Sequence, residues 1–221
     1  MTKSLTDTAP GLRLEDLTVS LGTNRLVAIE ATVDPGEILT VMGPSGSGKS
    51  TLLAAITGTL APGFTMTGRV LLDGEDITDR PTHRRGIGLM MQDDVLFPHL
   101  SVGANLAFGL SPTIRGHAAR AARVEAALDA AGLGGMAARD PATLSGGQRS
   151  RVALMRALLA EPRAILLDEP FSKLDTSLRT QIRSFTFEQI TAARLPAILV
   201  THDHEDAAAA GGRIMAPRTE A

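Results

Sequence analysis

The sequence has no cysteine, no tryptophan and no tyrosine, and six phenylalanines are its only aromatic residues. Without cysteine the chain can form neither disulfides nor thiolate metal sites, and it suits a reducing compartment. Without tryptophan or tyrosine, the core must be filled mainly by aliphatic residues and methionine. The hydrophobic content of 43% over 221 residues is ample for one large domain or two small ones.

The sequence also lacks a strong excess of charge and a long apolar run. Its formal net charge of -2 argues against a general nucleic-acid binder, which would show a basic excess. No apolar run approaches the ~18 to 20 residues that a membrane helix needs. Residues 1–10 are polar and have no apolar region of the signal-peptide kind. We therefore expect any contact with a membrane to be made through a partner.

Charge is nevertheless uneven along the chain. Residues 112–163 hold eight arginines and four acidic residues, a local charge of +4. Two interpretations stay open: a solvated helical face, or a region that contacts phosphates. The arginines are Arg115, Arg120, Arg123, Arg139, Arg149, Arg151, Arg156 and Arg163.

The hydrophobic pattern predicts an α/β fold with a mostly parallel sheet. Alternating residues over 12–21 and 26–33 predict an antiparallel hairpin of strands. Short apolar runs predict buried parallel strands at 38–42, 86–91, 164–167 and 197–200, and a short strand and turn is expected over 68–74. Helices are expected at 49–57, 101–110, 116–131, 149–160 and 176–193.

The order of these elements predicts how the single domain, residues 1–221, is organised. Residues 93–160 have no strong strand signal and read as an inserted α-helical subdomain. Residues 12–92 and 161–215 would form the core, with the N-terminal antiparallel β subdomain attached to a parallel sheet.

A glycine-rich loop lies between the apolar run 38–42 and the helix expected at 49–57. Its spacing fits G-x-x-x-x-G-K-[ST], the phosphate-binding loop of P-loop NTPases. Backbone N–H groups of such a loop surround phosphates, a lysine pairs with the β and γ phosphates, and a hydroxyl binds Mg²⁺. The alternative is a glycine-rich hairpin turn at a strand end, against which stand the strand before the loop, the helix after it and the fully matched motif positions. The predicted nucleotide contacts are Gly43, Pro44, Ser45, Gly46, Ser47, Gly48, Lys49, Ser50 and Thr51.

Two adjacent acids end the apolar run 164–167. Ligands of open α/β sheets bind at the carboxyl ends of the strands, where these acids would lie. Asp168 would hold Mg²⁺ together with Ser50, and Glu169 would act as the general base for the attacking water. As an alternative, the pair could cap a helix before Pro170.

Leu144-Ser145-Gly146-Gly147-Gln148 lies just before the helix expected at 149–160. Small residues and glycines before a helix form a second anion nest, which is redundant unless it serves another molecule's nucleotide. A helix-capping turn is the simpler alternative. With the glycine loop and the paired acids, this stretch closely resembles the ATP-binding subunit of ABC transporters, from about Leu12 to Arg213. The resemblance implies ATP and Mg²⁺ as cofactors.

The resemblance also implies a head-to-tail dimer and further site residues. Ser145, Gly146, Gly147 and Gln148 of one copy would close on the γ phosphate held by the other. Three more positions match family motifs: Gln92, which would sense Mg²⁺ and the water; His202, which would contact the γ phosphate; and Asp175, which would face the second copy.

Two departures from the family pattern stand out. Lys173 occupies a position before Asp175 where alanine is common. The early strand hairpin lacks the aromatic residue that usually stacks on adenine, near Leu21 here. We expect apolar cover from Leu21 or Val27 and loose base selectivity, since base stacking contributes ~1 to 3 kcal/mol.

The resemblance further implies membrane partners. In ABC importers the segment after Gln92 borders a groove for a permease helix, and Leu96, Phe97 and Leu100 are apolar enough to bind one. The segment 93–102 is similar to that of importers for thiamine, polyamines, sulfate or iron. We expect permease subunits, a second copy, a solute-binding protein and a place at the cytoplasmic face of the inner membrane. No regulatory domain is expected before the end at Ala221.

Two rivals belong to other classes. A soluble ABC ATPase acting on ribosomes or DNA usually has two cassettes or a long coiled coil, and this sequence has neither. A P-loop GTPase or kinase would have no use for the Leu144–Gln148 stretch, and no Asn-Lys-x-Asp guanine motif is present.

Overall fold

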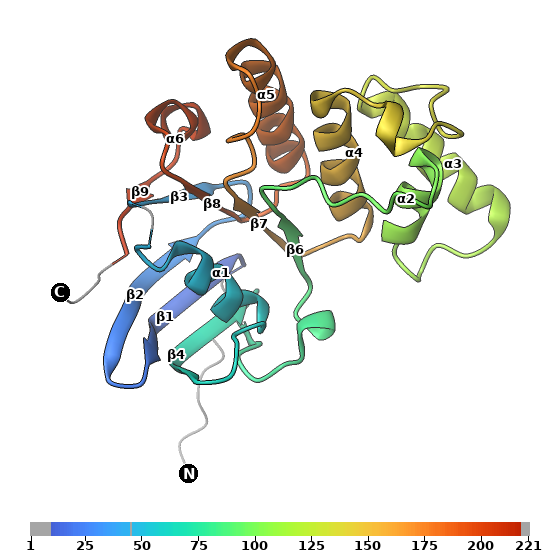
Figure 1. The fold of residues 1–221 in the computed structure, drawn as a ribbon. Helices are drawn as coiled ribbons and strands as arrows, with labels where there is room; N and C mark the ends of the chain where they lie inside the picture. The colour runs from blue at the N-terminus through green and yellow to red at the C-terminus, as the bar shows by residue number, and fades with distance from the viewer. Residues whose placement is uncertain (1–9, 45, 218–221) are drawn as a thin grey trace. The chain divides into compact units, whose positions relative to one another are not determined.

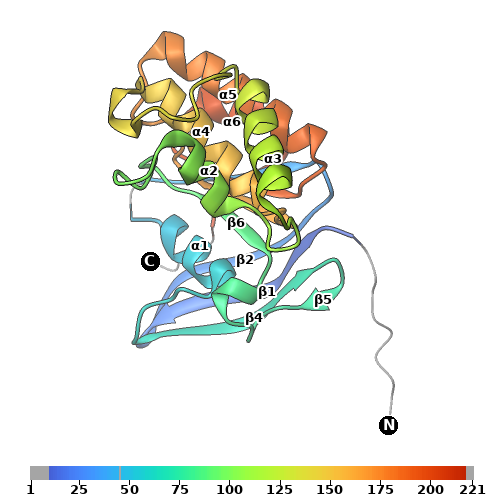
Figure 2. The same cartoon turned by 90° about the vertical axis from the view of Figure 1, so that its right-hand side faces the viewer.

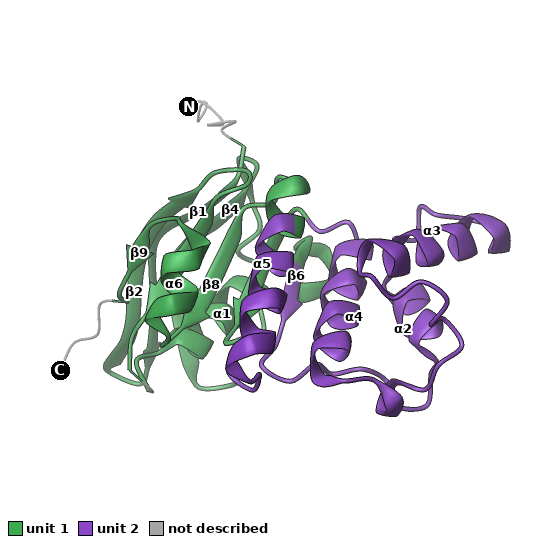
Figure 3. Cartoon of the chain, turned by 90° about the horizontal axis from the view of Figure 1, so that it is seen from above, with its two compact units in different colours: residues 1–87, 163–169, 189–221 green, residues 88–162, 170–188 purple. Residues whose placement is uncertain are grey.

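The computed structural model describes residues 10–44 and 46–217, so Ser45 and residues 1–9 of the polar start lie outside the described residues. The chain divides into two compact units (Figure 3). The first covers residues 1–87, 163–169 and 189–221, and the second covers 88–162 and 170–188. The expected helical segment 93–160 lies inside the second unit, which also takes in residues 170–188.

An antiparallel sheet forms one side of the first unit (Figure 1). Its strands are β1 (Leu12–Leu21), β2 (Asn24–Val33), β4 (Phe64–Leu72) and β5 (Glu75–Asp76), in the order β2-β1-β4-β5. The expected hairpin pairs Leu12 with Val33 and Leu21 with Asn24. Alternation places every second residue of β1 in the core over most of its length.

Strand β4 is longer than the short strand expected at 68–74. Gly68 lies in the middle of β4, opposite the irregularity between Glu15 and Thr18 of β1. Its φ is 85°, and a Cβ there would lie 2.4 Å from the Asp16 carbonyl oxygen. Glycine therefore permits a close backbone approach at a bulge, and it does not mark the start of the strand.

The second sheet has the order β6-β7-β8-β3-β9. It consists of β3 (Ile38–Met42), β6 (Ile87–Met90), β7 (Ala164–Asp168), β8 (Ala197–Thr201) and β9 (Ile214–Met215). Strand β3 pairs in parallel with β8 and β9, and β7 pairs in parallel with β8. Helix α1 (Lys49–Thr57) contacts β1, β2 and β7, and α6 (His204–Ala210) contacts β3 and β8. The mostly parallel sheet and the antiparallel β subdomain are thus confirmed.

The second unit is mainly helical. It contains α2 (Val102–Gly109), α3 (His117–Ala130), α4 (Gly146–Leu159) and the part of α5 (Thr176–Ala192) up to residue 188. Figure 2 shows α2, α3 and α4, whose apolar faces share one core built around Leu106, Leu128 and Val152. Two 3₁₀ helices, η1 (Thr82–Arg84) and η2 (Pro141–Thr143), complete the described elements. Within residues 10–44 and 46–217, no helix is both long and apolar enough to span a membrane.

The arginine-rich region is explained largely by structure. Five of its eight arginines donate hydrogen bonds to backbone carbonyls, which ties loops to neighbouring helices and strands. These five are Arg120, Arg149, Arg151, Arg156 and Arg163. Arg115, Arg123 and Arg139 are exposed. The local charge of +4 therefore does not by itself indicate a phosphate-binding surface.

Candidate functional site

The glycine loop connects β3 to α1 and packs against the start of β2. Gly46 and Gly48 have φ of 83° and 80°, in the left-handed region that glycine adopts readily. A Cβ on Gly48 would lie 2.8 Å from the Leu26 carbonyl oxygen. The glycines thus allow the loop to turn directly into the helix while it lies against another strand.

Lys49 is directed back into this loop. Its side chain is buried with 6% exposure, and Nζ donates to the carbonyl oxygens of Gly43 and Pro44, each at 2.8 Å. The Ser47 hydroxyl is also buried, and it has no hydrogen-bond partner among the described residues. A buried ammonium, an unpartnered hydroxyl and the first amides of α1 together fit an anion with several oxygens, such as a polyphosphate.

Asp168 and Glu169 lie at the carboxyl end of β7. Burial raises the pKa of Asp168, the Glu169 charge raises it further, and Lys49 lowers it. Glu169 has a φ of 45°, which is uncommon for a residue with a side chain, and its N–H donates to the Val200 carbonyl at 2.9 Å. This backbone hydrogen bond to β8 holds Glu169 in an unfavourable conformation, as often occurs at functional sites.

His202 follows β8 and reaches Glu169. Its Nδ1 lies 3.1 Å from Glu169 Oε1. Because β7, β8 and β3 are neighbours in the sheet, Glu169, His202 and the glycine loop follow the carboxyl ends of adjacent parallel strands. The structure thus brings together, within the first unit, four residues from three separate motifs of the sequence: Lys49, the Asp168–Glu169 pair and His202.

The same edge offers ligands suited to Mg²⁺. Ser50 is exposed at the first turn of α1, and Asp168 contributes a half-buried carboxylate. Oxygen donors are what Mg²⁺ prefers, and a cation would relieve the repulsion between Asp168 and Glu169. The described residues include no group of three or more His, Cys, Asp or Glu that could hold a metal ion alone. One hydroxyl and one carboxylate are a donor set that fits a metal whose other ligands are phosphate oxygens.

The second unit holds the other predicted residues. Gln92 follows β6, and its Nε2 donates to Ser172 Oγ at 3.1 Å. Asp175 is exposed and accepts hydrogen bonds from the Leu178 N–H at 3.0 Å and the Ser177 hydroxyl at 2.9 Å. Those bonds lower the pKa of Asp175 and make it a cap at the start of α5.

The Leu144–Gln148 stretch corrects one expectation. Helix α4 begins at Gly146, three residues earlier than predicted, with Ser145 as its N-cap. Ser145 Oγ accepts from the Gln148 N–H, and Gln148 Oε1 accepts from the Ser145 N–H, which forms a capping box. The glycines therefore form the first helical turn and no separate nest precedes the helix. The capping alternative is correct as a description of local structure.

The surroundings of Leu21 correct another expectation. Leu21 is 46% exposed, whereas Val27 is fully buried beside Gly48 and cannot cover a base. Phe64, half-buried on β4, pairs directly with Leu21 of β1. Sequence reasoning missed this aromatic neighbour because the strands lie more than forty positions apart in the chain.

Sequence reasoning also missed Arg85, which anchors the far end of α1. Its side chain is buried, and Nη1 donates to the carbonyls of Ala55 and Ile56 at 3.0 and 2.8 Å. Burial lowers the pKa of Arg85. The last turn of α1 presents partial negative charge, which stabilises this cation.

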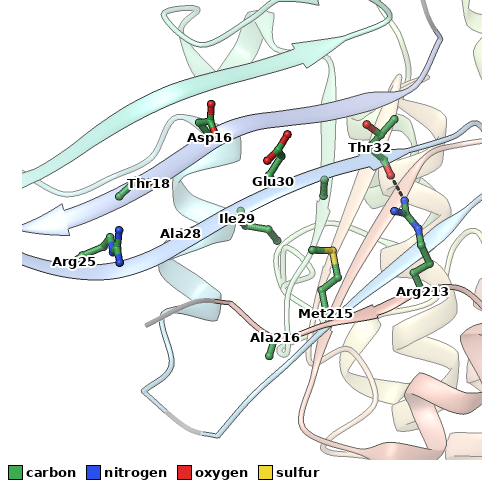
Figure 4. A pocket seen from close by; sticks show the side chains of 11 residues that line it. Asp16, Thr18, Arg25, Ala28, Ile29, Glu30, Thr32, Arg213, Met215 and Ala216 are labelled. Atoms are coloured by element: carbon green, nitrogen blue, oxygen red, sulfur yellow. Dashed lines mark hydrogen bonds between the residues drawn. The ribbon is translucent and has the colours of Figure 1, made fainter. Parts of the chain in front are cut away.

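A separate hollow is lined by residues of β1, of β2 and of the segment 213–216 (Figure 4). Its volume is ≈ 520 Å³, and charged side chains of both signs line it, including Asp16, Arg25, Glu30 and Arg213. Arg213 donates to the Thr32 carbonyl there. None of the predicted site residues lines this hollow.

Comparison with known proteins gives three kinds of similarity. The family model described as ABC transporter matches residues 26–172. An uncharacterized ABC transporter ATP-binding protein of Escherichia coli K12, YnjD, is 48% identical over 88% of this chain and 90% of its own length. The solved structure of cbiO1 from Clostridium perfringens, part of the ABC transporter complex cbiONQ, aligns with a TM-score of 0.83 at 27% identity, covering 95% of this chain and 85% of that one.

Two longer relatives are named for import. The Fe(3+) ions import ATP-binding protein FbpC of Mesorhizobium japonicum is 46% identical over 82% of this chain and 50% of its own length. The sulfate/thiosulfate import ATP-binding protein CysA 2 of Agrobacterium fabrum is 40% identical over 92% of this chain and 60% of its own length. The chain thus spans about half to three fifths of the length of these two relatives.

Proposed function

The chain belongs to the ABC transporter family, and from this premise we propose that it binds and hydrolyses ATP to power solute import through partner membrane subunits. The observation that carries the proposal is the convergence of Lys49, the Asp168–Glu169 pair and His202 at one edge of the parallel sheet. A soluble role at ribosomes or DNA remains the alternative that the experiments below must exclude.

Each residue of this edge has a chemical task. The loop amides and Lys49 would bind the β and γ phosphates, and Ser50 and Asp168 would hold Mg²⁺. Gln92, which belongs to the second unit, is the further metal ligand that the family resemblance implies. The metal, when bound, neutralises charge on the phosphates. Glu169 accepts a proton from the attacking water, and His202, 3.1 Å away, orients this carboxylate and contacts the γ phosphate.

A second copy would complete each site. The Ser145 Oγ accepts a hydrogen bond within the capping box of α4. Its O–H can therefore donate to a phosphate oxygen of the nucleotide that a second copy of the chain binds. The first amides of α4 add the positive end of the helix dipole. Gly146, Gly147 and Gln148 belong to this turn, and Asp175 would face the same partner.

The base is expected to lie against Leu21. Because Phe64 is the cross-strand neighbour of Leu21, an aromatic side chain from β4 stands in for the one that the hairpin lacks. Phosphate and metal contacts would still dominate the affinity, and base selectivity would be loose.

The segment after Gln92 is the proposed contact for a permease helix. Val95 and Phe108 are 53% and 68% exposed, and the Phe108 ring meets the Phe97 ring edge-on at 4.7 Å. Asn105 is fully buried and holds the Phe97 backbone through both its N–H and its carbonyl. Leu96, Phe97 and Leu100 are all partly buried, and Leu96 also packs against the core of the second unit. The exposed Phe108 beside Phe97 adds a further anchor to the three residues expected from the sequence.

The names of the relatives support small-solute import, since FbpC is named for import of Fe(3+) ions and CysA 2 for import of sulfate or thiosulfate. The proposed complex adds permease subunits and a solute-binding protein, and it would lie at the cytoplasmic face of the inner membrane. The solute itself would never contact this chain.

Replacement of Glu169 tests its proposed role as the general base in ATP hydrolysis. Glu169→Gln keeps the size of the side chain and removes the base, so ATP should still bind, dimers should accumulate, and turnover should fall by about 10²- to 10⁴-fold. Phosphate release and light scattering measure these properties. Glu161→Gln is a matched control, because Glu161 is an exposed glutamate that also has a left-handed φ, of 54°, and its variant should keep its turnover.

Affinity capture of the chain from membranes tests the proposed role in solute import. Recovery of hydrophobic permease subunits with the chain supports import, whereas recovery of ribosomes or DNA in their place rejects it. Rapid hydrolysis by Glu169→Gln would reject the assigned chemistry independently of any partner.

A further inference from the structure

Three consecutive residues of the second unit each make a polar contact with another functional segment. Gln92 donates from Nε2 to Ser172 Oγ at 3.1 Å, Asp93 accepts from Lys173 Nζ, and Asp94 accepts from Ser150 Oγ at 3.0 Å. Ser172 and Lys173 lie just before Asp175, and Ser150 lies on α4 after the Ser145 cap. The segment 92–94 is therefore joined to both neighbouring segments.

These contacts surround one hollow of ≈ 510 Å³. Its lining brings together Gln92, Asp93, Gly146 and Lys173 from the three segments. Two opposite charges therefore face each other beside the residue that the proposed function assigns to the metal. The common alanine in place of Lys173 would leave Asp93 without this cation.

The hydrogen bond to Ser172 fixes how the Gln92 amide faces. A glutamine amide has one end that donates and one that accepts. Since the NH₂ group donates to Ser172, the carbonyl oxygen Oε1 is the end left to accept from water or to bind a cation. The Lys173–Asp93 ion pair holds the next residue of the same segment and so limits its movement.

We propose that Ser172 and Lys173 are positioning residues for Gln92: they fix the direction of its amide, with Oε1 as the end available to the metal that accompanies ATP. The proposal rests on the proposed function. Partners of metal ligands commonly act in this way, by fixing the orientation of the group that binds the metal.

The expected effects are bounded by the exposure of these groups. The side chains of Lys173 and Asp93 are 55% and 69% exposed, and ion pairs of this kind contribute ~0 to 1 kcal/mol, or up to about fivefold in affinity. A neutral hydrogen bond contributes ~0.5 to 1.5 kcal/mol, so loss of the Ser172 hydroxyl should cost about two- to tenfold.

The experiment measures metal affinity without turnover. The full chain is mixed with a non-hydrolysable ATP analogue and titrated with Mn²⁺, whose free fraction is read by electron paramagnetic resonance. Lys173→Ala should weaken Mn²⁺ binding by about two- to fivefold and Ser172→Ala by up to about tenfold. Lys173→Arg should preserve it, and the charge reversal of Asp93→Lys with Lys173→Asp should restore at least half of the loss.

Arg69→Ala is the matched control, since it removes another exposed ion pair, with Glu15 in the first unit, and should leave Mn²⁺ affinity unchanged. Equal affinity in the wild type, Lys173→Ala and Ser172→Ala overturns the proposal. Tighter binding in Lys173→Ala also overturns it, because the pair would then hold Gln92 away from the metal. If the wild type binds no nucleotide or metal, the proposed function fails instead.

Discussion

Asp168 shows, at the scale of a single residue, how a binding site can lower the folding stability of a chain that holds no nucleotide or metal. Its carboxyl group is half-buried beside the Glu169 carboxylate, and both burial and this neighbour raise its pKa. Folding without a ligand therefore brings two acids together at a strand end. The metal and phosphates that this edge fits would offset that cost, so site formation and ligand binding are linked.

Asp168→Asn is expected to stabilise the nucleotide-free chain. Because the pKa of Asp168 is raised, the folded state holds this proton to higher pH than the unfolded state, and the stability from this group falls as pH rises above the ordinary pKa of aspartic acid. The variant avoids that loss, so at neutral pH its Tm should lie above that of the wild type, by at most about 2 to 4 °C because solvent screens this half-buried group. Thermal unfolding at several pH values measures the difference, which should widen from about pH 4 upwards.

Asp76→Asn provides a control of opposite sign. Burial acts to raise the pKa of Asp76, but hydrogen bonds from Thr78 outweigh it and bring the pKa below its ordinary value. Neutralising Asp76 should therefore lower Tm at neutral pH. A Tm for Asp168→Asn that falls below the wild type would contradict the assignment of strain to the paired acids.

Helices and strands are predictable from the sequence where a single hydrophobic pattern runs through a continuous segment of the chain. The hairpin of β1 and β2, the buried strands and the long helices follow from alternation, apolar runs and helical spacing. The sequence predicts the start of α4 at residue 149, because two consecutive glycines are typical of a loop, although Ser145 and Gln148 have capping-box spacing and the helix begins at Gly146. Strand β9 has only two residues, too few to show a periodic pattern, and it is defined by its pairing with β3.

The site residues were likewise predictable where a motif lies within one continuous stretch of sequence. Lys49 follows from the spacing of the glycine loop, Asp168 and Glu169 follow from their place at a strand end, and His202 follows from the family resemblance. A parallel sheet gathers the segments that follow its strands at one edge. The contacts of Arg85 with α1, Phe64 with Leu21, and Lys173 with Asp93 join distant parts of the chain. No local pattern encodes them, so the structure was needed to find them.

Gly147 is expected to be required by packing of α4 against α5. A Cβ on Gly147 would lie 2.5 Å from Leu178 Cδ1 and 3.2 Å from Ile182 Cδ1. Gly147→Ala should therefore be less stable than Gly146→Ala, by up to about 1 kcal/mol, since the side-chain ends of Leu178 and Ile182 must shift to make room. Gly146→Ala is the matched control, because its nearest neighbour would be 3.8 Å away. Denaturant unfolding measures both, and equal losses would contradict the packing argument.

The whole molecule divides its predicted chemistry between two units. The first holds the glycine loop, the paired acids and His202, and the second holds Gln92, the Ser145 cap and Asp175. The family to which the chain belongs and the exposed N-terminus of α4 support a dimer in which each copy supplies what the other lacks. Closed two-fold assemblies of this kind use the same surfaces on both copies.

Complementation between two inactive variants tests this claim most directly. Lys49→Ala removes the phosphate contact, Ser145→Arg blocks the α4 cap, and neither variant should hydrolyse ATP alone. Co-expressed in equal amounts with different tags, they should form mixed dimers with one intact site, which restores about a quarter of the wild-type rate. A mixture that is no more active than the separate variants, although mixed dimers are recovered, would contradict the account.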